Sequence, residues 1–302
     1  MHKTCIIIAG PTAVGKTSLA IRLAQHFSTQ IISADSRQCY KELNIGVAKP
    51  SKEELEQVPH HFINTISITD AFTAAAYEKY ALQTIEKIFE SNDVAVMVGG
   101  TGLYIKSFIE GLDEIPEVDS EVRERIVTSY HQQGLEWLQQ EVKKIDPTYF
   151  EVGEVYNPQR LMRALEVKMS TGKSITSFQQ KNKKERSFNI LQFGLELPRP
   201  VLYNRINNRA DQMIKMGLEE EVRNLIPFKH LNALQTVGYR ELFEYFENSV
   251  SREKAIEMIR QNTRHYAKRQ MTWFKKDTRI KWIDNSDEEK ALHYIIQNAI
   301  SV

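Results

Sequence analysis

Cysteine is the scarcest residue of this chain, with Cys5 and Cys39 the only two among 302 residues. They form no C-x-x-C pair, and no set of histidines at zinc-ligand spacing accompanies them, which argues against a disulfide framework or a structural zinc site. Cys5 stands in an apolar, β-branched run, so we expect it to be a small core residue of a strand.

Long apolar runs are absent too. None approaches the roughly 18 consecutive apolar residues that indicate a membrane span. The five apolar residues before Gly10 are too few for the hydrophobic region of a secretion signal. We therefore expect a cytoplasmic protein, and at 41% hydrophobic residues the chain can bury a full core.

A large net charge is also missing, because 40 Lys and Arg offset 39 Asp and Glu and leave a formal charge of +1. The charges are unevenly distributed: the segment from Arg252 to Trp282 contains ten Lys or Arg against three Asp or Glu. A local basic surface in a balanced chain indicates a polyanionic partner such as nucleic acid.

What the chain does contain is a phosphate-binding loop, here called the P-loop, that fits the pattern G-x-x-x-x-G-K-[ST]. An apolar run precedes it and residues with helical spacing follow it, which is the strand, loop and helix context that the pattern requires. A chance glycine-rich turn is the alternative, and this agreement disfavours it. The residues expected to bind a diphosphate are Gly10, Pro11, Thr12, Ala13, Val14, Gly15, Lys16 and Thr17.

The chemistry of the P-loop follows from its backbone. Gly10 and Gly15 permit a tight turn whose N–H groups form an anion-binding nest at a helix N-terminus. Lys16 adds a mobile positive charge, and the Thr17 hydroxyl is placed to ligate a Mg²⁺ that bridges two phosphates. The loop alone leaves open whether the diphosphate belongs to a nucleotide.

Two further strand ends carry polar residues. The strand expected at 30–34 ends at Asp35, and the buried strand expected at 93–98 ends in Gly99, Gly100 and Thr101. Ligands of open α/β sheets gather at the carboxyl ends of strands, so these residues should face the same crevice as the P-loop. Asp35 is thus a catalytic candidate, with a helix N-cap as the alternative. Thr101 can offer its hydroxyl, although the two glycines could simply form a helix entry turn.

The character of the chain changes after Gly111. A proline-containing acidic linker leads to helical segments at 120–133 and 135–144. A further helix begins with Asn157 as N-cap and Pro158 in the first position, and ends at Gly172. A strand resumes at 190–195. The sequence therefore predicts an all-helical insertion, residues 112–188, in an α/β core made of residues 1–111 and 189–302.

Several basic side chains are candidates for phosphate contacts. Gln159, Arg160 and Arg163 lie together in the first turns of their helix; such a face is either merely solvated or suited to nucleic acid. Arg205 and Arg209, four residues apart on a later helix, either clamp phosphate oxygens or are ordinary surface arginines.

The helix expected over about 252–275 carries a basic ridge. Arg260, Arg264 and Lys268 recur at every fourth residue. With aromatic residues interleaved, this pattern favours binding to a phosphate backbone over a face that is merely solvated.

Taken together, these segments resemble the bacterial tRNA dimethylallyltransferases, the isopentenyl transferases that modify the adenosine on the 3′ side of the anticodon. The matching segments occur in the family's order and cover nearly the whole chain: 10–17, 35–38 with Tyr40, 46–50, 99–106, 157–167, 236–239 and 262–274. Arg37 and Cys39 depart from the Met and Val common in the family, and the chain lacks the C-terminal zinc finger of eukaryotic members.

The resemblance implies a fold and a reaction. The fold is a P-loop NTPase-like parallel sheet core with an inserted all-helical domain that closes over the tRNA anticodon stem-loop. The reaction transfers the dimethylallyl group of dimethylallyl diphosphate to N6 of adenosine 37 in tRNAs that read codons beginning with U, with Mg²⁺ as cofactor. The products are N6-(dimethylallyl)adenosine and diphosphate, and a monomer without an obligate protein partner suffices.

The resemblance also implies roles for particular residues. Asp35 is the base that takes the N6 proton, Thr101 positions the amine or the diphosphate, and Lys16 stabilises the diphosphate as it leaves. The implied tRNA contacts are Asp35, Ser36, Arg37, Gln38, Thr101, Arg123, Gln159, Arg160, Leu161, Met162 and Arg163.

Two other functions compete with this interpretation. An ATP-dependent small-metabolite kinase would share the P-loop, but it normally places an Asp at an apolar strand end to hold Mg²⁺, where this chain has glycines. A nucleotide-switched RNA-binding module would need an N-K-x-D loop, which is not visible. The prenyltransferase is favoured over both.

Overall fold

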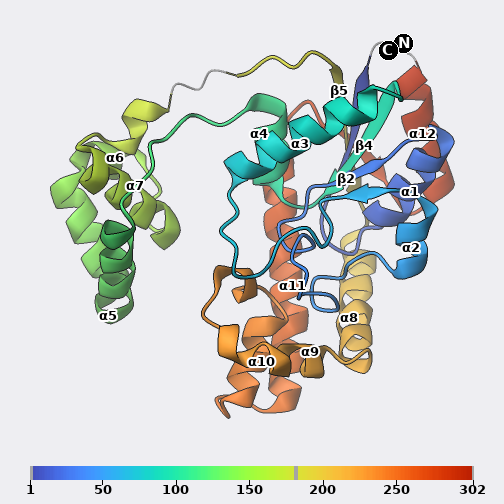
Figure 1. The fold of residues 1–302 in the computed structure, drawn as a ribbon. Coiled ribbons are helices and arrows are strands. Elements are labelled where there is room, and N and C mark those ends of the chain that lie inside the picture. Colours follow the sequence, from blue (N-terminus) through green and yellow to red (C-terminus); the bar gives the residue numbers. More distant parts are fainter. Residues whose placement is uncertain (1–2, 180–182, 301–302) are drawn as a thin grey trace. The chain divides into compact units, whose positions relative to one another are not determined.

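The computed structural model describes residues 3–179 and 183–300. By its internal contacts the chain divides into a core unit, Met1–Ile109 with Glu185–Val302, and an inserted unit, Glu110–Lys184 (Figure 1). The divisions predicted from the sequence lie at 112 and 188. Among the described residues, no helix is both long enough and apolar enough to cross a membrane.

The core unit is built on one sheet of parallel strands, in the order β3-β2-β4-β1-β5-β6. This confirms the predicted α/β fold with a parallel sheet. Every residue of β1 and β4 is buried, which is why both read as continuous apolar runs in the sequence. The strands are β1 (Thr4–Ala9), β2 (Ile31–Ser33), β3 (His60–His61), β4 (Val94–Gly99), β5 (Asn189–Glu196) and β6 (Lys281–Asp284).

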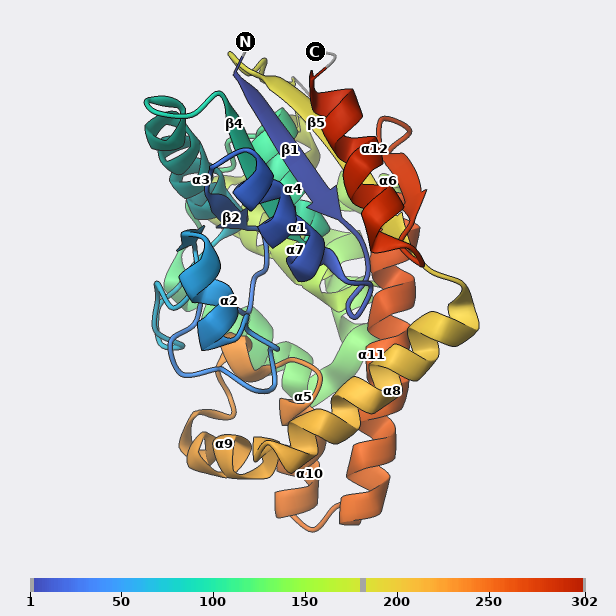
Figure 2. The same ribbon diagram turned by 90° about the vertical axis from the view of Figure 1, so that its right-hand side faces the viewer.

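Helices cover both faces of the sheet (Figures 1 and 2). Along β1, Cys5 and Ile7 pack towards α3 (Ala74–Phe89) and α4 (Gly102–Glu110). Ile6 and Ile8 pack towards α1 (Lys16–His26) and α12 (Glu288–Ile300) on the other face, as the alternation of a strand requires. Cys5 is a free, fully buried core residue, as predicted.

The remaining core helices lie beyond the carboxyl ends of the central strands, on the side towards which β1 points in Figure 2. They are α2 (Lys52–Gln57), α8 (Arg199–Lys215), α9 (Leu218–Asn224), α10 (Tyr239–Phe246) and α11 (Arg252–Phe274), with short 3₁₀ turns at Ile226–Phe228 and Asn232–Leu234. Here α8 and α11 lie side by side and are joined by an ion pair between Asp211 and Arg260.

The inserted unit is helical, with α5 (Ser120–Ile145), α6 (Pro147–Val152), α7 (Pro158–Thr171) and a 3₁₀ turn at Ile175–Phe178. Gly134 interrupts α5 with φ 78° and ψ −168°, which confirms the two predicted segments on either side of it. Asn157 caps α7 by accepting a hydrogen bond from Arg160 N, and Gly172 ends it in the left-handed conformation.

A buried ion pair holds the core unit beside the point where the insertion leaves it. The side chains of Arg186 and Glu78 are 9% and 10% exposed and meet at 3.1 Å. Arg186 also donates to the carbonyl oxygens of Phe108 and Ser107 near the end of α4. One guanidinium therefore joins α3, the end of α4 and the chain that re-enters the sheet.

Glu78→Gln should lower the free energy of unfolding by about 3 kcal/mol, because it leaves the arginine buried without its counter-charge. Urea denaturation followed by circular dichroism measures this. The matched control is Asp93→Asn, which removes an exposed pair with Lys3 and should leave the midpoint unchanged. Equal midpoints for Glu78→Gln and the wild-type chain would contradict the assignment.

Candidate active site

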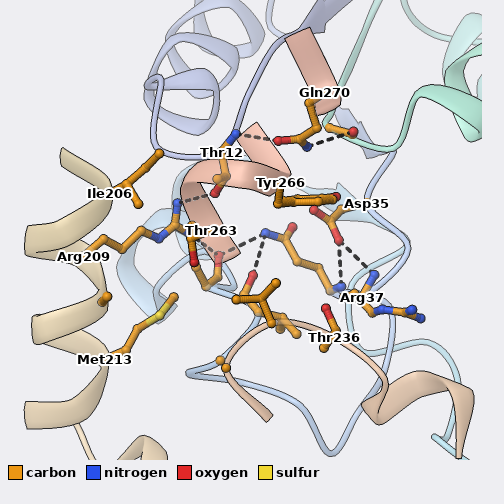
Figure 3. A pocket seen from close by; sticks show the side chains of 18 of the residues that line it. Thr12, Asp35, Arg37, Ile206, Arg209, Met213, Thr236, Thr263, Tyr266 and Gln270 are labelled. Atoms are coloured by element: carbon orange, nitrogen blue, oxygen red, sulfur yellow. Dashed lines mark hydrogen bonds between the residues drawn. The ribbon is translucent and has the colours of Figure 1, made fainter. Parts of the chain in front are cut away.

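The polar strand ends meet in one cavity of about 150 Å³ at the carboxyl ends of β1, β2 and β4, with α8 and α11 as further walls (Figure 3). Its polar lining includes Thr12, Lys16, Thr17, Asp35 and Arg209. Its apolar lining includes Ile206, Ala210, Met213, Val237 and Ile259. The same cavity thus has charged side chains in one part of its lining and apolar side chains in another.

The P-loop has the backbone that the glycine pattern predicts. Gly10 has φ 149° and Gly15 has φ 101°. A Cβ at Gly10 would lie 2.8 Å from the carbonyl oxygen of Leu195, a contact that no side chain tolerates. Gly15 precedes α1 without any side-chain cap, so the first N–H groups of that helix remain available to an anion.

Lys16 lies in this cavity with its ammonium folded back on the loop. Its Nζ donates to the carbonyl oxygen of Pro11 at 2.7 Å. The pKa of Lys16 is lowered from 10.5 to about 8, mainly by burial and to a smaller extent by the nearby Arg209, while Asp35 acts in the opposite direction. The lysine is therefore close to losing its charge until an anion binds beside it.

Affinity for an allylic diphosphate should consequently fall as the pH rises above about 8, because anion binding requires the ammonium form of Lys16. Titration calorimetry at pH 7, 8 and 9 measures this, with a loss approaching tenfold per pH unit above the pKa. In Lys16→Arg, whose guanidinium stays charged, the dependence should vanish. An unchanged dependence in Lys16→Arg would show that Lys16 is not the group whose titration weakens binding.

Oxygen donors that suit Mg²⁺ lie beside the P-loop. Thr17 lines the cavity, and within residues 3–179 and 183–300 its hydroxyl makes no hydrogen bond. The Asp35 carboxylate lines the same cavity. No group of three or more His, Cys, Asp or Glu in the described residues could enclose a metal. One or two protein oxygens are enough for Mg²⁺, because this ion usually keeps several waters and takes its other ligands from substrate phosphates.

Asp35 both caps a backbone turn and lines the cavity. Its Oδ1 accepts hydrogen bonds from Arg37 N at 2.8 Å and Gln38 N at 3.3 Å, so it caps the turn that follows β2. The same carboxylate lines the cavity beside Tyr266 (Figure 3). Because the turn fixes one oxygen, the orientation of the other is fixed as well.

Thr101 lies behind Asp35 and is not part of the cavity wall. Its Oγ1 accepts a hydrogen bond from Ser36 N at 3.0 Å and donates to Ser36 Oγ at 3.3 Å. Thr101 is thus joined to the loop that carries Asp35, and its expected contact with the amine or diphosphate stays a prediction.

The two arginines of α8 differ in their surroundings. Arg209 lines the cavity and donates to Thr12 Oγ1 and to Ala48 O, both at 3.4 Å, and burial lowers its pKa. These long hydrogen bonds are weak, so the guanidinium can turn towards an anion. Arg205 is exposed one turn earlier, and its Nη1 lies 3.8 Å from where a Cβ of Gly15 would stand.

Gln270 of α11 is a cavity residue whose role the sequence analysis missed. Its Oε1 accepts from Thr12 N and its Nε2 donates to Gly100 O, both at 2.9 Å (Figure 3). It thereby ties the P-loop to the end of β4 and occupies one amide of the expected nest. A Cβ at Gly100 would lie 2.2 Å from Nε2 of Gln270, so any larger residue at this position would displace that amide.

A second missed group holds the loop 44–50. The Glu221 carboxylate accepts hydrogen bonds from the backbone N–H groups of Asn44, Ile45 and Gly46 and from the hydroxyl of Tyr239. Gly46 is required because a Cβ there would meet the Tyr239 ring at 2.5 Å.

Asn285, which follows β6, contacts the P-loop through its side-chain amide. Its Nδ2 donates to Val14 O at 2.8 Å, and its buried Oδ1 has no hydrogen-bond partner among the described residues. A Cβ at Gly15 would lie 2.6 Å from Nδ2, so the amide also restricts that glycine. No motif in the sequence distinguished Asn285.

The expected tRNA contacts near Asp35 lie in the core unit. Ser36, Arg37 and Gln38 are partly exposed, and Arg37 and Gln38 line the cavity. Gln38 Nε2 donates to the carbonyl oxygens of Val47 and Ala48, so it also braces the loop 44–50.

The expected tRNA contacts on α7 need a correction. Gln159 and Arg160 are exposed, but Leu161 and Met162 are 0% and 5% exposed and pack in the core of the inserted unit. Residues packed in this way cannot contact a tRNA, because the helical period turns this part of the stretch inward. Arg123 and Arg163 lie 3.9 Å and 3.5 Å from the buried carboxylate of Glu166.

The basic ridge on α11 also needs a correction. Arg260 pairs with Asp211 of α8, and Arg264 donates to Asn207 Oδ1 of the same helix. Both arginines also contact Glu257, whereas Lys268 is exposed. Two of the three expected cations therefore join helices, because α8 covers the face that periodicity alone leaves open.

A family model described as IPP transferase matches residues 38–277. A "tRNA dimethylallyltransferase" from Christiangramia forsetii is 48% identical over all of both chains, and "tRNA dimethylallyltransferase 1" from Bacteroides thetaiotaomicron is 45% identical over 98% of this chain and 96% of its own.

Solved structures agree with these relatives. The tRNA isopentenylpyrophosphate transferase of Bacillus halodurans is 34% identical, with a TM-score of 0.72 over 99% of this chain and 96% of its own. A eukaryotic dimethylallyltransferase, described as acting on tRNA, is 27% identical with a TM-score of 0.78 over 99% of this chain and 78% of its own.

Proposed function

Because the chain belongs to the IPP transferase family, we propose that it transfers the dimethylallyl group of dimethylallyl diphosphate to N6 of adenosine 37 in tRNA. One observation carries this proposal: a single cavity combines a P-loop, an apolar wall and the carboxylate of Asp35. An allylic diphosphate needs the first two features, and a weakly nucleophilic amine needs the third.

The P-loop amides, Lys16 and Arg209 bind the diphosphate in this proposal. The five-carbon tail then points away from the P-loop, along the wall formed by Ile206, Met213 and Ile259. Burying the tail there removes it from water at a gain of about 0.8 kcal/mol for each methylene. Because water is also excluded from the reacting carbon, hydrolysis of the donor is suppressed.

The reaction is a substitution at C1 of the donor. The N6 lone pair forms the new C–N bond while the C1–O bond breaks, and the diphosphate leaves with the bonding electron pair. Asp35 takes the proton that N6 loses, which is worth about 10²–10⁴ in rate for a general base. Lys16 stabilises the charge that develops on the leaving diphosphate.

Mg²⁺ would be held by the Thr17 hydroxyl and the diphosphate oxygens, and when bound it neutralises part of the charge on the leaving group.

The adenine cannot react while it is stacked in the anticodon loop. We propose that it is flipped into the cavity at a cost of a few kcal/mol, and that the inserted unit closes over the anticodon stem-loop. The exposed side chains of Arg123, Gln159 and Arg160 support such a role. We also propose that the enzyme acts as a monomer.

The decisive experiment incubates the purified protein with Mg²⁺, unmodified tRNA and either dimethylallyl diphosphate or ATP. The RNA is then digested to nucleosides, whose masses are measured. We expect adenosine to gain one prenyl mass with the allylic donor only. Consumption of ATP without a prenylated nucleoside would favour the P-loop kinase.

A further inference from the structure

We propose that Met213 limits the length of the prenyl chain that the enzyme accepts, by closing the apolar end of the active-site cavity against a second cavity. This inference rests on the proposed function and concerns its donor specificity. The ligand class for the second cavity is the distal isoprene unit of a longer allylic diphosphate, such as the ten-carbon geranyl diphosphate.

The second cavity lies on the other side of the loop 44–50. Its volume is about 460 Å³, and its walls include Ile45, Leu55 and Met216. Ala48, Arg209 and Met213 line both cavities and therefore form the partition between them. The second cavity is thus large, partly apolar and separated from the first by the thickness of a few side chains.

Of these three residues, Met213 has the only long apolar side chain. Ala48 contributes little more than backbone, and its carbonyl oxygen accepts a hydrogen bond from Gln38 Nε2 at 3.0 Å. Arg209 is polar and donates both to Thr12 Oγ1 at the diphosphate end and to Ala48 O. The Met213 thioether projects from α8 into the cavity, below Arg209 in Figure 3. Methionine is unbranched and fills irregular gaps.

The chemistry fixes which end of the donor meets this partition. C1 must lie between the P-loop, which holds its diphosphate, and Asp35, which accepts the proton from the attacking amine. The distal carbons are consequently directed to the apolar wall on α8 and α11. A ten-carbon donor reacts by the same bond changes: the N6–C1 bond forms, the C1–O bond breaks and diphosphate departs with the electron pair. Only the space beyond the fifth carbon differs.

The test compares kcat/KM for dimethylallyl and geranyl diphosphate, with unmodified tRNA and mass measurement of the prenylated nucleoside. The wild-type chain should strongly favour the five-carbon donor. Met213→Ala opens the partition and should shift the ratio towards geranyl diphosphate by at least about tenfold, a scale typical of pocket-size discrimination. Met213→Leu conserves the volume and should keep the wild-type ratio.

Met213→Val removes less volume than Met213→Ala and should shift the ratio in the same direction by a smaller factor. This variant tests the role of Met213 in the partition if the alanine variant fails to fold. The matched control is Met216→Ala on the same helix, because Met216 lines only the second cavity and its removal leaves the partition closed. An unchanged ratio in folded Met213→Ala or Met213→Val, or an equal shift in Met216→Ala, would overturn the proposal that Met213 limits the length of the prenyl chain. A wild-type chain that makes no product with dimethylallyl diphosphate would instead overturn the proposed function.

Discussion

Asp35→Asn should lower kcat by about 10²–10⁴ while leaving tRNA affinity within a few-fold of the wild-type value. Asparagine keeps the size of the side chain, and its carbonyl oxygen can still accept the hydrogen bonds from Arg37 N and Gln38 N that shape the turn after β2. What the variant loses is the ability to take a proton. The loop, and with it the tRNA surface around it, should therefore stay in place.

Single-turnover prenylation and filter binding with the same tRNA separate these two effects. Asp70→Asn is the matched control, because Asp70 also caps a backbone turn, through Ser67 N, but does not line the cavity. Its rate should match that of the wild-type chain. If Asp35→Asn weakened tRNA binding as much as it slowed turnover, Asp35 would act by holding the loop and not as the base.

The parts of the site that could be predicted from sequence are those encoded by short, continuous patterns. The P-loop needs glycines, a lysine and a hydroxyl at fixed spacing between a strand and a helix, and all of these lie within residues 4–26. Asp35 could be placed beside it because the carboxyl ends of parallel strands share one edge of the sheet. These inferences require no knowledge of distant contacts.

The residues that were missed act across the chain. Gln270 meets Thr12 across 258 positions, and Asn285 meets Val14 across 271. Such a pairing depends on where a helix or a short edge strand packs, which no local pattern encodes. Even β6, which precedes Asn285, was missed, because it spans four residues and is exposed at both ends.

The basic ridge on α11 was also misinterpreted because its contacts are with a distant part of the chain. Periodicity correctly placed Arg260 and Arg264 on one face of α11, but it could not show that Asp211 and Asn207 of α8 would face them. Charge along one helix identifies a binding surface only when the neighbouring helix is known.

Lys16→Met should lower kcat by about 10²–10³, the loss that accompanies removal of one donor worth about 2.7–4 kcal/mol to a developing negative charge. The charge on the diphosphate increases as the C1–O bond breaks, so the lost interaction is stronger in the transition state than in the bound ground state. The turnover number should consequently fall by more than KM rises.

The same variant should not be less stable than the wild-type chain. At pH 7 the folded protein carries a charged Lys16 that burial disfavours, since its pKa is lowered from 10.5 to about 8. A lowered lysine pKa means that the unfolded chain binds the extra proton between these two values, so wild-type stability should rise as the pH increases from about 8 to 10.5. Methionine removes both the cost and this dependence.

Thermal unfolding at pH 7 and pH 10, together with steady-state kinetics, tests both expectations. Lys49→Met is the matched control: Lys49 donates to Tyr40 O, Asn44 Oδ1 and Asn64 Oδ1, so its replacement should destabilise the loop 44–50. A loss of stability in Lys16→Met as large as that in Lys49→Met would make Lys16 a structural residue. If the melting temperature of Lys16→Met is unchanged or raised while kcat falls strongly, the charge of Lys16 contributes to catalysis and not to stability.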